Sequence, residues 1–264
     1  MRRSFLTLVA ALIPVAVATP APCTLVGLQY VTDSYVATQT GAEQPEMPPS
    51  LGNGLGFLFR QGYVENFDSV TDQMMRWPMR VDHRRSLLDR VTCETFTELI
   101  GSIDGKPYAL GTRLPVIRDV AAAEIAMIWA TTGYRGFDAE RYLRAAKSED
   151  WSVIPLAQRD SRKVLETVAK AYLDALLLGK ATVEPWGAPC SSCQVGLPEP
   201  AVNIANRHTV IDETLGAVAV FCTFGADPNS GRIRTPDVHL FRVEGGKVRY
   251  VHAITHLPNS VVSG

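Results

Sequence analysis

Apolar residues recur at helical spacing in two segments of the chain. In residues 24–40, Leu28, Val31 and Tyr35 lie three or four positions apart, which places them on one face of a helix. Residues 162–179, RKVLETVAKAYLDALLLG, show the same period. The pattern therefore predicts one amphipathic helix in each half of the chain.

Segments rich in β-branched residues follow each predicted helix. Their apolar and polar positions alternate, which is typical of strands with one buried face. In the first half they are residues 81–100, read as two strands with a turn near Arg90, and residues 108–116 and 124–131, read as a hairpin. In the second half they are residues 201–211, 217–224, 238–243 and 247–256, with a hairpin turn at Glu244–Gly246.

The two halves also match residue by residue. An offset of 123 residues superposes Asp89 on Asp212 and HRRSLLDRVTCETFTELIGS on NRHTVIDETLGAVAVFCTFG. The same offset pairs Arg84 with Arg207, Leu88 with Ile211, Cys93 with Gly216 and Trp129 with His252. In the predicted helices, Tyr35 matches Tyr172. In the predicted strands, Thr112 stands opposite His239. The chain is therefore predicted to contain one α+β unit twice, each a helix packed on a curved antiparallel sheet in a cone-shaped fold, in domains 19–147 and 148–264.

The first 18 residues have the features of a secretory signal peptide. Arg2 and Arg3 supply positive charge, residues 5–17 are apolar, and small residues precede Thr19. The apolar run is shorter than the roughly 20 residues needed to cross a bilayer. We therefore expect cleavage, entry into the secretory pathway as a secreted or lumenal protein, and no membrane span after signal removal.

Five cysteines remain after this cleavage. In an oxidising compartment they favour disulfides over metal sites. Cys190 and Cys193 lie in a proline-flanked loop and form one disulfide candidate; Cys23 and Cys93 form another, which would tie the first helix to its sheet. Cys222 lies in an apolar strand and is predicted to be a buried free thiol. No metal site is predicted, because no ligands with suitable spacing lie near the loop cysteines.

Charge and motifs exclude several classes of protein. The chain carries 26 basic and 27 acidic residues, a net charge of −1, without a basic patch, so no nucleic-acid partner is expected. It lacks a Ser-His-Asp elbow, a GxGxxG turn, a P-loop and an HExxH helix. This leaves proton-transfer or addition chemistry without a cofactor in an apolar cavity.

Several longer segments resemble one known family: PYALGTRLPV, SEDWSVIP, PWGAPC, NRHTVIDETLGAV and HLFRVEGGKVRYVHAITH. Together they look like a fungal secreted family of tandem SnoaL-like, or ketosteroid-isomerase-like (NTF2-like), domains, over about Tyr63 to Leu257. Members that resemble this chain occur as dimerising cyclases of maleidride (nonadride) pathways, which are thought to join two maleic-anhydride-type units. The chain departs from the family between Cys190 and Cys193, where relatives carry a longer insert.

The last predicted hairpin concentrates groups that can transfer protons. His252 and Tyr250 share one face of its second strand, because alternate residues of a strand point the same way, and His239 lies on the preceding strand. Histidine titrates near neutrality, so His252 and His239, with Tyr250, are the predicted catalytic residues. The alternative is that these side chains hydrogen-bond within the sheet or face solvent.

Four further residues are predicted to bind substrate. Arg84 and Arg207 precede apolar strands, where a guanidinium would hold carboxylate or anhydride oxygens. The alternative is pairing with Asp89 or Asp212 across a turn. Glu65 and Asn66 lie where the family's first strand enters its cavity, and would position a substrate or cap a bulge.

The expected function follows from this resemblance. It implies an enzyme of secondary metabolism, a dimerising cyclase that joins two maleic-anhydride-type polyketide units by cofactor-free proton abstraction and conjugate addition. The alternatives are an isomerase or dehydratase acting on a small polyketide, and a non-catalytic secreted binding protein. The expected partners are an apolar, anhydride or carboxylate substrate and a helper protein of the same pathway.

Overall fold

The computed structural model describes residues 23–43, 45–46, 78–116, 125–133, 137–177, 204–224 and 235–256. These residues form an α+β fold with three α-helices and two four-stranded antiparallel sheets. Sheet A contains β1 (Arg80–Asp89), β2 (Glu94–Ile103), β3 (Lys106–Pro115) and β4 (Ala126–Thr131), in that order. Sheet B contains β5 (Ile204–Asp212), β6 (Ala217–Phe224), β7 (Thr235–Glu244) and β8 (Lys247–Thr255). The helices are α1 (Leu25–Thr40), α3 (Ala139–Ser148) and α4 (Arg162–Leu177), with a short 3-10 turn, η3, at Leu156–Gln158.

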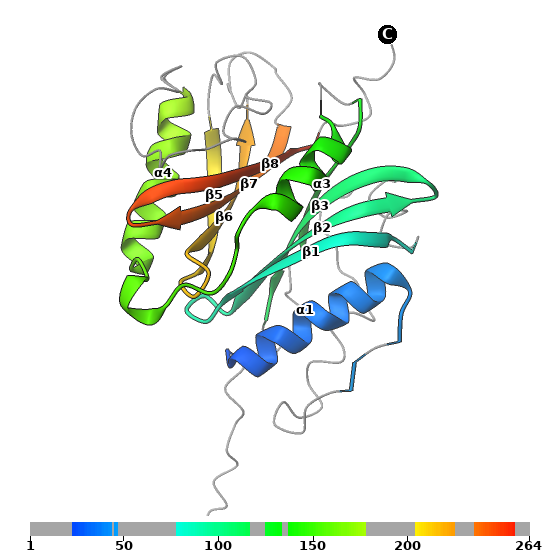
Figure 1. Cartoon of the computed structure of the whole chain (residues 1–264), viewed down its shortest axis with the longest axis horizontal. Coiled ribbons are helices and arrows are strands. Elements are labelled where there is room, and N and C mark those ends of the chain that lie inside the picture. Colours follow the sequence, from blue (N-terminus) through cyan, green and yellow to red (C-terminus); the bar gives the residue numbers. More distant parts are fainter. Residues whose placement is uncertain are drawn as a thin grey trace, which may run out of the picture.

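The elements stack in four layers, in the order α1, sheet A, sheet B and α4 (Figure 1). Leu28, Val31 and Tyr35 of α1 pack on sheet A, and this face of the helix is the apolar stripe that the sequence predicts. We call α1 with sheet A module 1, and α4 with sheet B module 2. The face of sheet A that points away from α1 packs against the face of sheet B that points away from α4, and this contact joins the modules.

Local signals at both ends fix the bounds of α1. The hydroxyl of Thr24 accepts a hydrogen bond from the amide of Gly27 at 3.1 Å, as an N-cap residue does. At the other end Gly41 adopts φ 68°, and its amide donates to Ala37 and Thr38. The disulfide between Cys23 and Cys93 then ties this helix to the β1–β2 turn, which confirms one predicted candidate pair.

Close packing between the sheets depends on one small residue. Phe96 of sheet A and Phe221 of sheet B meet edge to face, with ring centroids 5.9 Å apart. Beside them, a Cβ atom on Gly111 would lie 2.8 Å from the Val238 side chain and 3.1 Å from that of Phe96. Glycine at this position therefore allows the two sheets to approach.

Strand pairing confirms the predicted repeat over the first hairpin of each module. Asp89 pairs with Glu94 in sheet A as Asp212 pairs with Ala217 in sheet B, so the offset of 123 residues holds. The intervening turns agree as well: φ is 60° at Cys93 and 54° at the equivalent Gly216. The order of helix and strands is therefore the same in both modules.

Beyond β2 the offset changes, and one predicted match is wrong. A two-residue turn joins β2 and β3, whereas residues 225–234 separate β6 from β7. Trp129 pairs with Leu110, whereas His252 pairs with Leu240 on the opposite face of its sheet. By pairing, the equivalent of His252 is Ala126 and that of Trp129 is Thr255, because an odd shift in register turns every side chain to the other face.

Candidate functional site

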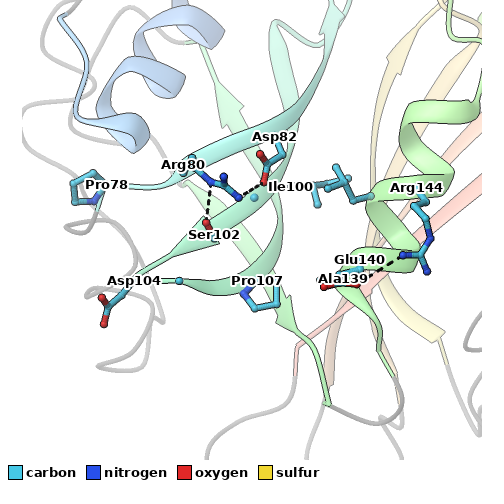
Figure 2. A pocket seen from close by; sticks show the side chains of 13 residues that line it. Pro78, Arg80, Asp82, Ile100, Ser102, Asp104, Pro107, Ala139, Glu140 and Arg144 are labelled. Carbon is cyan, nitrogen blue, oxygen red and sulfur yellow. Dashed lines mark hydrogen bonds and ion pairs between the residues drawn. The ribbon is translucent and has the colours of Figure 1, made fainter.

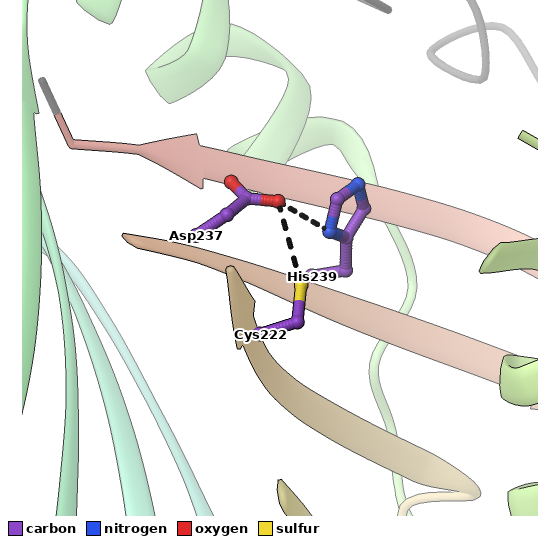
Figure 3. A group of neighbouring side chains, drawn as sticks. All are labelled: Cys222, Asp237 and His239. Carbon is purple, nitrogen blue, oxygen red and sulfur yellow. Dashed lines mark hydrogen bonds and ion pairs between the residues drawn. The ribbon is translucent and has the colours of Figure 1, made fainter. Parts of the chain in front are cut away.

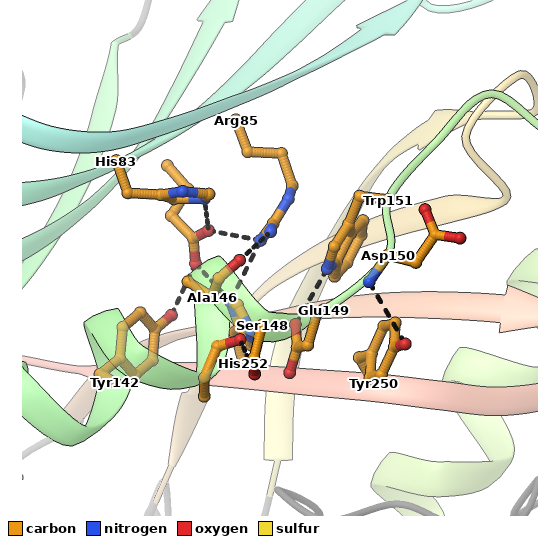
Figure 4. A network of polar contacts seen from close by, with 12 residues as sticks. His83, Arg85, Tyr142, Ala146, Ser148, Glu149, Asp150, Trp151, Tyr250 and His252 are labelled. Carbon is orange, nitrogen blue, oxygen red and sulfur yellow. Dashed lines mark hydrogen bonds and ion pairs between the residues drawn. The ribbon is translucent and has the colours of Figure 1, made fainter.

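The predicted catalytic residues His252 and Tyr250 lie together between the two sheets (Figure 4). They share the face of β8 that carries Ile254, which packs in the inter-sheet core. The hydroxyl of Tyr250 accepts a hydrogen bond from the backbone amide of Asp150 at 3.3 Å. Alternation along the strand is therefore confirmed, and the face concerned is the junction between modules rather than the face beneath α4.

His252 bridges two carboxylates. Its Nδ1 lies 2.7 Å from Glu98 of sheet A, and its Nε2 lies 2.7 Å from Glu149, which follows α3. All three side chains are almost fully buried. A doubly protonated imidazolium satisfies both contacts, since each nitrogen then donates to one carboxylate.

Electrostatics at the junction favour this charged form. Burial alone would lower the pKa of His252, but Glu98 and Glu149 raise that pKa to about 9. Burial alone would raise the pKa of Glu98, but His252 and Arg85 lower it to about 2. At neutral pH the imidazole therefore already holds the proton that a general base must accept.

Three more side chains complete this junction network, which we define as Arg85, Glu98, Tyr142, Glu149, Trp151 and His252. Arg85 donates to Glu98 at 2.7 Å and stacks over the ring of Trp151 at 3.9 Å. Tyr142 donates to Glu98 at 2.8 Å, and burial, with the Glu98 carboxylate, raises the pKa of its phenol. The arrangement balances two cations against two carboxylates and connects both modules to the segment between them.

His239 lies on the other face of sheet B, beneath α4, in a group that we call the β7 cluster (Figure 3). Its Nδ1 is 2.8 Å from Oδ2 of Asp237, and the same oxygen lies 3.9 Å from Sγ of Cys222. The other oxygen of Asp237 accepts a hydrogen bond from Thr255 at 2.8 Å. The exposed fractions of Cys222, Asp237 and His239 are 4%, 0% and 3%, so the cluster is shielded from water.

Tyr172 of α4 packs beside His239, with ring centroids 6.0 Å apart. Burial raises the pKa of its phenol, with a further contribution from the Asp237 carboxylate. In module 1 the matched Tyr35 contacts Thr112, hydroxyl to hydroxyl, at 2.7 Å. These contacts confirm that Tyr35 matches Tyr172 and that Thr112 stands opposite His239. An imidazole has thus replaced a hydroxyl in module 2.

Cys222 is a buried free thiol, as predicted. Burial raises the pKa of this thiol, and the Asp237 carboxylate raises it further. The carboxylate of Asp237, rather than an imidazole, lies nearest to the sulfur. Both effects hold Cys222 in its thiol form, so the geometry does not activate it as a nucleophile, which must be a thiolate.

Both predicted arginines pair with an acidic residue of the helix in their own module. Arg84 contacts Asp33 of α1, and Arg207 contacts Asp174 of α4 at 2.7 Å. Neither arginine contacts Asp89 or Asp212. The alternative is therefore right that each arginine pairs with an aspartate, but wrong about which aspartate. The cause is the alternation of side chains along β1 and β5. It turns Arg84 and Arg207 toward the helices and the two aspartates toward the junction.

A hollow with a volume of about 790 Å³ lies on module 1 (Figure 2). It opens between the β2–β3 turn and the N-terminal part of α3. Among the residues that line it, Arg80 contacts Ser102 and Asp82, and Arg144 pairs with Glu140. Among the predicted site residues that the structure describes, none lines this hollow.

Four predicted residues, namely Glu65, Asn66, Cys190 and Cys193, lie outside the described residues, as does the predicted signal peptide. Sequence reasoning missed Asp237, Glu98 and Glu149. A signal for Asp237 was present, since Asp237 and His239 are alternate residues of one strand and must share a face. Glu98 and Glu149 gave no such signal, because they approach His252 only after the modules pack together.

Residues 158–255, which span α4 and sheet B, match a protein family described only as a domain of unknown function (DUF8021). Among curated proteins and solved structures, none matches the chain. The family match thus covers the module that carries the β7 cluster and assigns it no activity. Within the described part of the chain, no helix combines the length and apolar character needed to cross a membrane.

Proposed function

We propose that the protein is a secreted, cofactor-independent enzyme that moves a proton on a small apolar substrate, with His239 as the base. The observation that carries this proposal is the contact of 2.8 Å between His239 Nδ1 and Asp237 Oδ2 in the apolar layer beneath α4. The negative charge of this carboxylate stabilises the imidazolium that forms when His239 accepts a proton from the substrate. Burial strengthens the charge interactions that this transfer uses.

Tyr172 supplies the second group that such chemistry needs. Its phenol stays protonated at neutral pH, because burial raises its pKa. It can therefore donate a hydrogen bond to the oxygen of an enolate formed next to His239. His252 fits the role of base less well, since two carboxylates hold it in its charged form.

The resemblance to tandem SnoaL-like domains supplies the substrate class. A helix on an antiparallel sheet, repeated in two modules, is compatible with the cone-shaped fold of that family. The substrate we infer is a maleic-anhydride-type unit, whose carbanion adds to a second unit as in the dimerising cyclases. The Cys23–Cys93 disulfide supports secretion, because such bonds persist in oxidising compartments.

A second candidate function is binding without catalysis. The hollow on module 1 favours it, because it is large enough for a small metabolite and lies apart from His239. In that case a ligand would bind beside Arg80 and Ser102 and leave unchanged. The two candidates differ in whether module 2 accelerates a proton transfer.

The test uses the full chain in D₂O with a substituted maleic anhydride as substrate. Deuterium incorporation at the alkyl carbon attached to the ring double bond, where loss of a proton gives a dienolate, reports proton abstraction. Formation of the coupled product reports cyclisation. We expect His239→Gln to slow both by about 100-fold or more, since general base catalysis contributes about 10²–10⁴-fold. The matched control is His208→Gln, a half-exposed histidine on the junction face that should leave both rates unchanged.

Two results would reject the proposal. A folded His239→Gln variant with wild-type exchange would remove His239 from the role of base. If the wild-type protein binds the anhydride but accelerates neither exchange nor coupling, the binding function is the better description. Circular dichroism of each variant separates loss of activity from loss of fold.

A further inference from the structure

We propose that module 2 binds one divalent metal ion of the class of Zn²⁺ through Cys222 Sγ, Asp237 Oδ2 and His239 Nδ1. Thiolate, carboxylate and imidazole are together a ligand set typical of this ion. The site shares His239 with the proposed catalytic function and regulates it. It can nevertheless be tested without any substrate.

The three ligand atoms are close to the spacing that such an ion needs. All of them lie within 4.8 Å of one another, with Asp237 Oδ2 2.8 Å from His239 Nδ1 and 3.9 Å from Cys222 Sγ (Figure 3). Ligands of a tetrahedral zinc ion stand about 3.3–3.7 Å apart, given bonds of about 2.0–2.3 Å. Small side-chain adjustments bring the three atoms to these distances and leave the fourth position of the ion for another ligand.

The strands hold the ligands in place. Cys222 and Asp237 are direct partners across β6 and β7, and Asp237 and Thr255 are direct partners across β7 and β8. The hydroxyl of Thr255 donates to Asp237 Oδ1 at 2.8 Å, which leaves Oδ2 directed at Cys222 and His239. An outer hydrogen bond of this kind orients the ligand in many metal sites.

In module 1, the positions equivalent to the three proposed ligands hold residues that are not metal ligands. Strand pairing makes Leu99 the equivalent of Cys222, Leu110 that of Asp237 and Thr112 that of His239. Leu99 and Leu110 are fully buried and pack against α1. The same fold is therefore stable with apolar residues there, whereas module 2 buries a thiol and a carboxylate at a cost in desolvation. A bound ion offsets that cost, because it interacts with all three groups at once.

The ion would inhibit the proposed proton transfer. On binding, the ion takes the lone pair of His239 Nδ1, and the neutral imidazole then carries its proton on Nε2. Neither nitrogen of His239 can then accept a proton from the substrate. The thiol of Cys222 releases its own proton to the solvent as the sulfur–metal bond forms, so no oxidant or reductant is needed.

The experiment titrates metal-free full chain with Co²⁺, which reports thiolate ligation through its charge-transfer absorption, and then displaces it with Zn²⁺. We expect one Co²⁺ per chain, a thiolate band, and complete displacement. Cys222→Ser should abolish the band. Thr255→Val, which keeps all three ligands, should weaken affinity by about tenfold or more. The Cys190→Ser/Cys193→Ser variant is the control, and should retain the band.

Absence of stoichiometric binding to folded wild-type protein would overturn the inference, as would a band that survives Cys222→Ser or that is lost in the Cys190→Ser/Cys193→Ser control. These outcomes leave the proposed enzyme untouched, because exchange activity is measured on metal-free protein. Conversely, Co²⁺ binding with no exchange activity would retain the site and reject the enzyme. Inhibition of exchange by equimolar Zn²⁺, reversed by a chelator, would support both.

Discussion

Asp89 and Asp212 each accept a hydrogen bond from a backbone amide of the other module, in a reciprocal arrangement across the junction. The carboxylate of Asp89 accepts from the amide of Ile211 at 2.9 Å, and that of Asp212 accepts from the amide of Leu88 at 3.1 Å. The two aspartates and the two amide residues are equivalent positions of the repeat. Such reciprocity defines the interface of a two-fold dimer, so the two modules pair as two copies of one protein would.

We expect Asp89→Asn to destabilise the protein strongly. Arg162 donates to both oxygens of Asp89 at 2.8 Å, and the side chain is fully buried. Loss of this charge weakens the hydrogen bonds that the buried carboxylate accepts, for which a cost of about 1.5–3 kcal/mol is typical, since the Arg162 end of the pair is partly exposed. Unfolding in urea measures the effect. Asp174→Asn is the matched control, because the Asp174 side chain is 60% exposed and its ion pair with Arg207 should contribute less than about 1 kcal/mol. Equal effects of the two substitutions would contradict this account of the junction.

The junction network predicts how stability depends on pH. The pKa of His252 rises from 6.5 to about 9 on folding, so its contribution is complete below pH 6.5 and is lost as the pH rises toward 9. The pKa of Glu98 falls from 4.5 to about 2, so its contribution is complete above pH 4.5 and is lost as the pH falls toward 2. The free energy of unfolding should therefore be greatest between about pH 4.5 and 6.5.

His252→Gln tests the alkaline part of this profile. The variant should be less stable at pH 6 and should lose less stability than the wild type between pH 6.5 and 9, because it lacks the group that titrates. Urea unfolding at a series of pH values gives both curves. An unchanged slope in His252→Gln would mean that this imidazole is not charged in the folded protein.

Local patterns in the sequence were enough to predict most of the fold. The alternation around Leu87 and the helical spacing of Leu28, Val31 and Tyr35 gave the elements and their buried faces. The first hairpin of each module also has the predicted register, because the β1–β2 turn and the β5–β6 turn have the same length. The third strand of module 2 follows a longer connection, and the offset fixed on Asp89 therefore misaligned His252.

The environment of each histidine could not be read from the sequence. Whether His252 or His239 lies beneath α4 depends on which face of sheet B packs against sheet A. Alternation predicts that Tyr250 and His252 share a face, but it does not say which partner covers that face. The carboxylates of Glu98 and Glu149 reach His252 over 154 and 103 residues of chain, and only tertiary packing brings them there.

Variants at Cys93 separate two contributions to stability, that of the disulfide and that of backbone strain in the turn. Cys93 has φ 60°, where its glycine counterpart Gly216 has φ 54°. Loss of the disulfide, which closes a separation of 70 residues, should cost about 4 kcal/mol. In the double variants, Cys23→Ser/Cys93→Gly should be more stable than Cys23→Ser/Cys93→Ala by about 1 kcal/mol, because glycine adopts this conformation without strain. Thermal unfolding of both variants measures the difference, and equal stabilities would show that the turn is not strained.

Gly111 should be the most sensitive glycine in the contact between the sheets. A Cβ at this position lies 2.8 Å from the side chain of Val238, so Gly111→Ala forces sheet A and sheet B apart or displaces that side chain. We expect a loss of about 1–3 kcal/mol, typical of an overpacked core. In Gly111→Ala/Val238→Ala the new methyl group occupies space that the smaller side chain leaves. The double variant should therefore be more stable than the sum of the two single effects, as a double-mutant cycle in urea would measure. Strict additivity would mean that the sheets adjust elsewhere and that Gly111 does not set their separation.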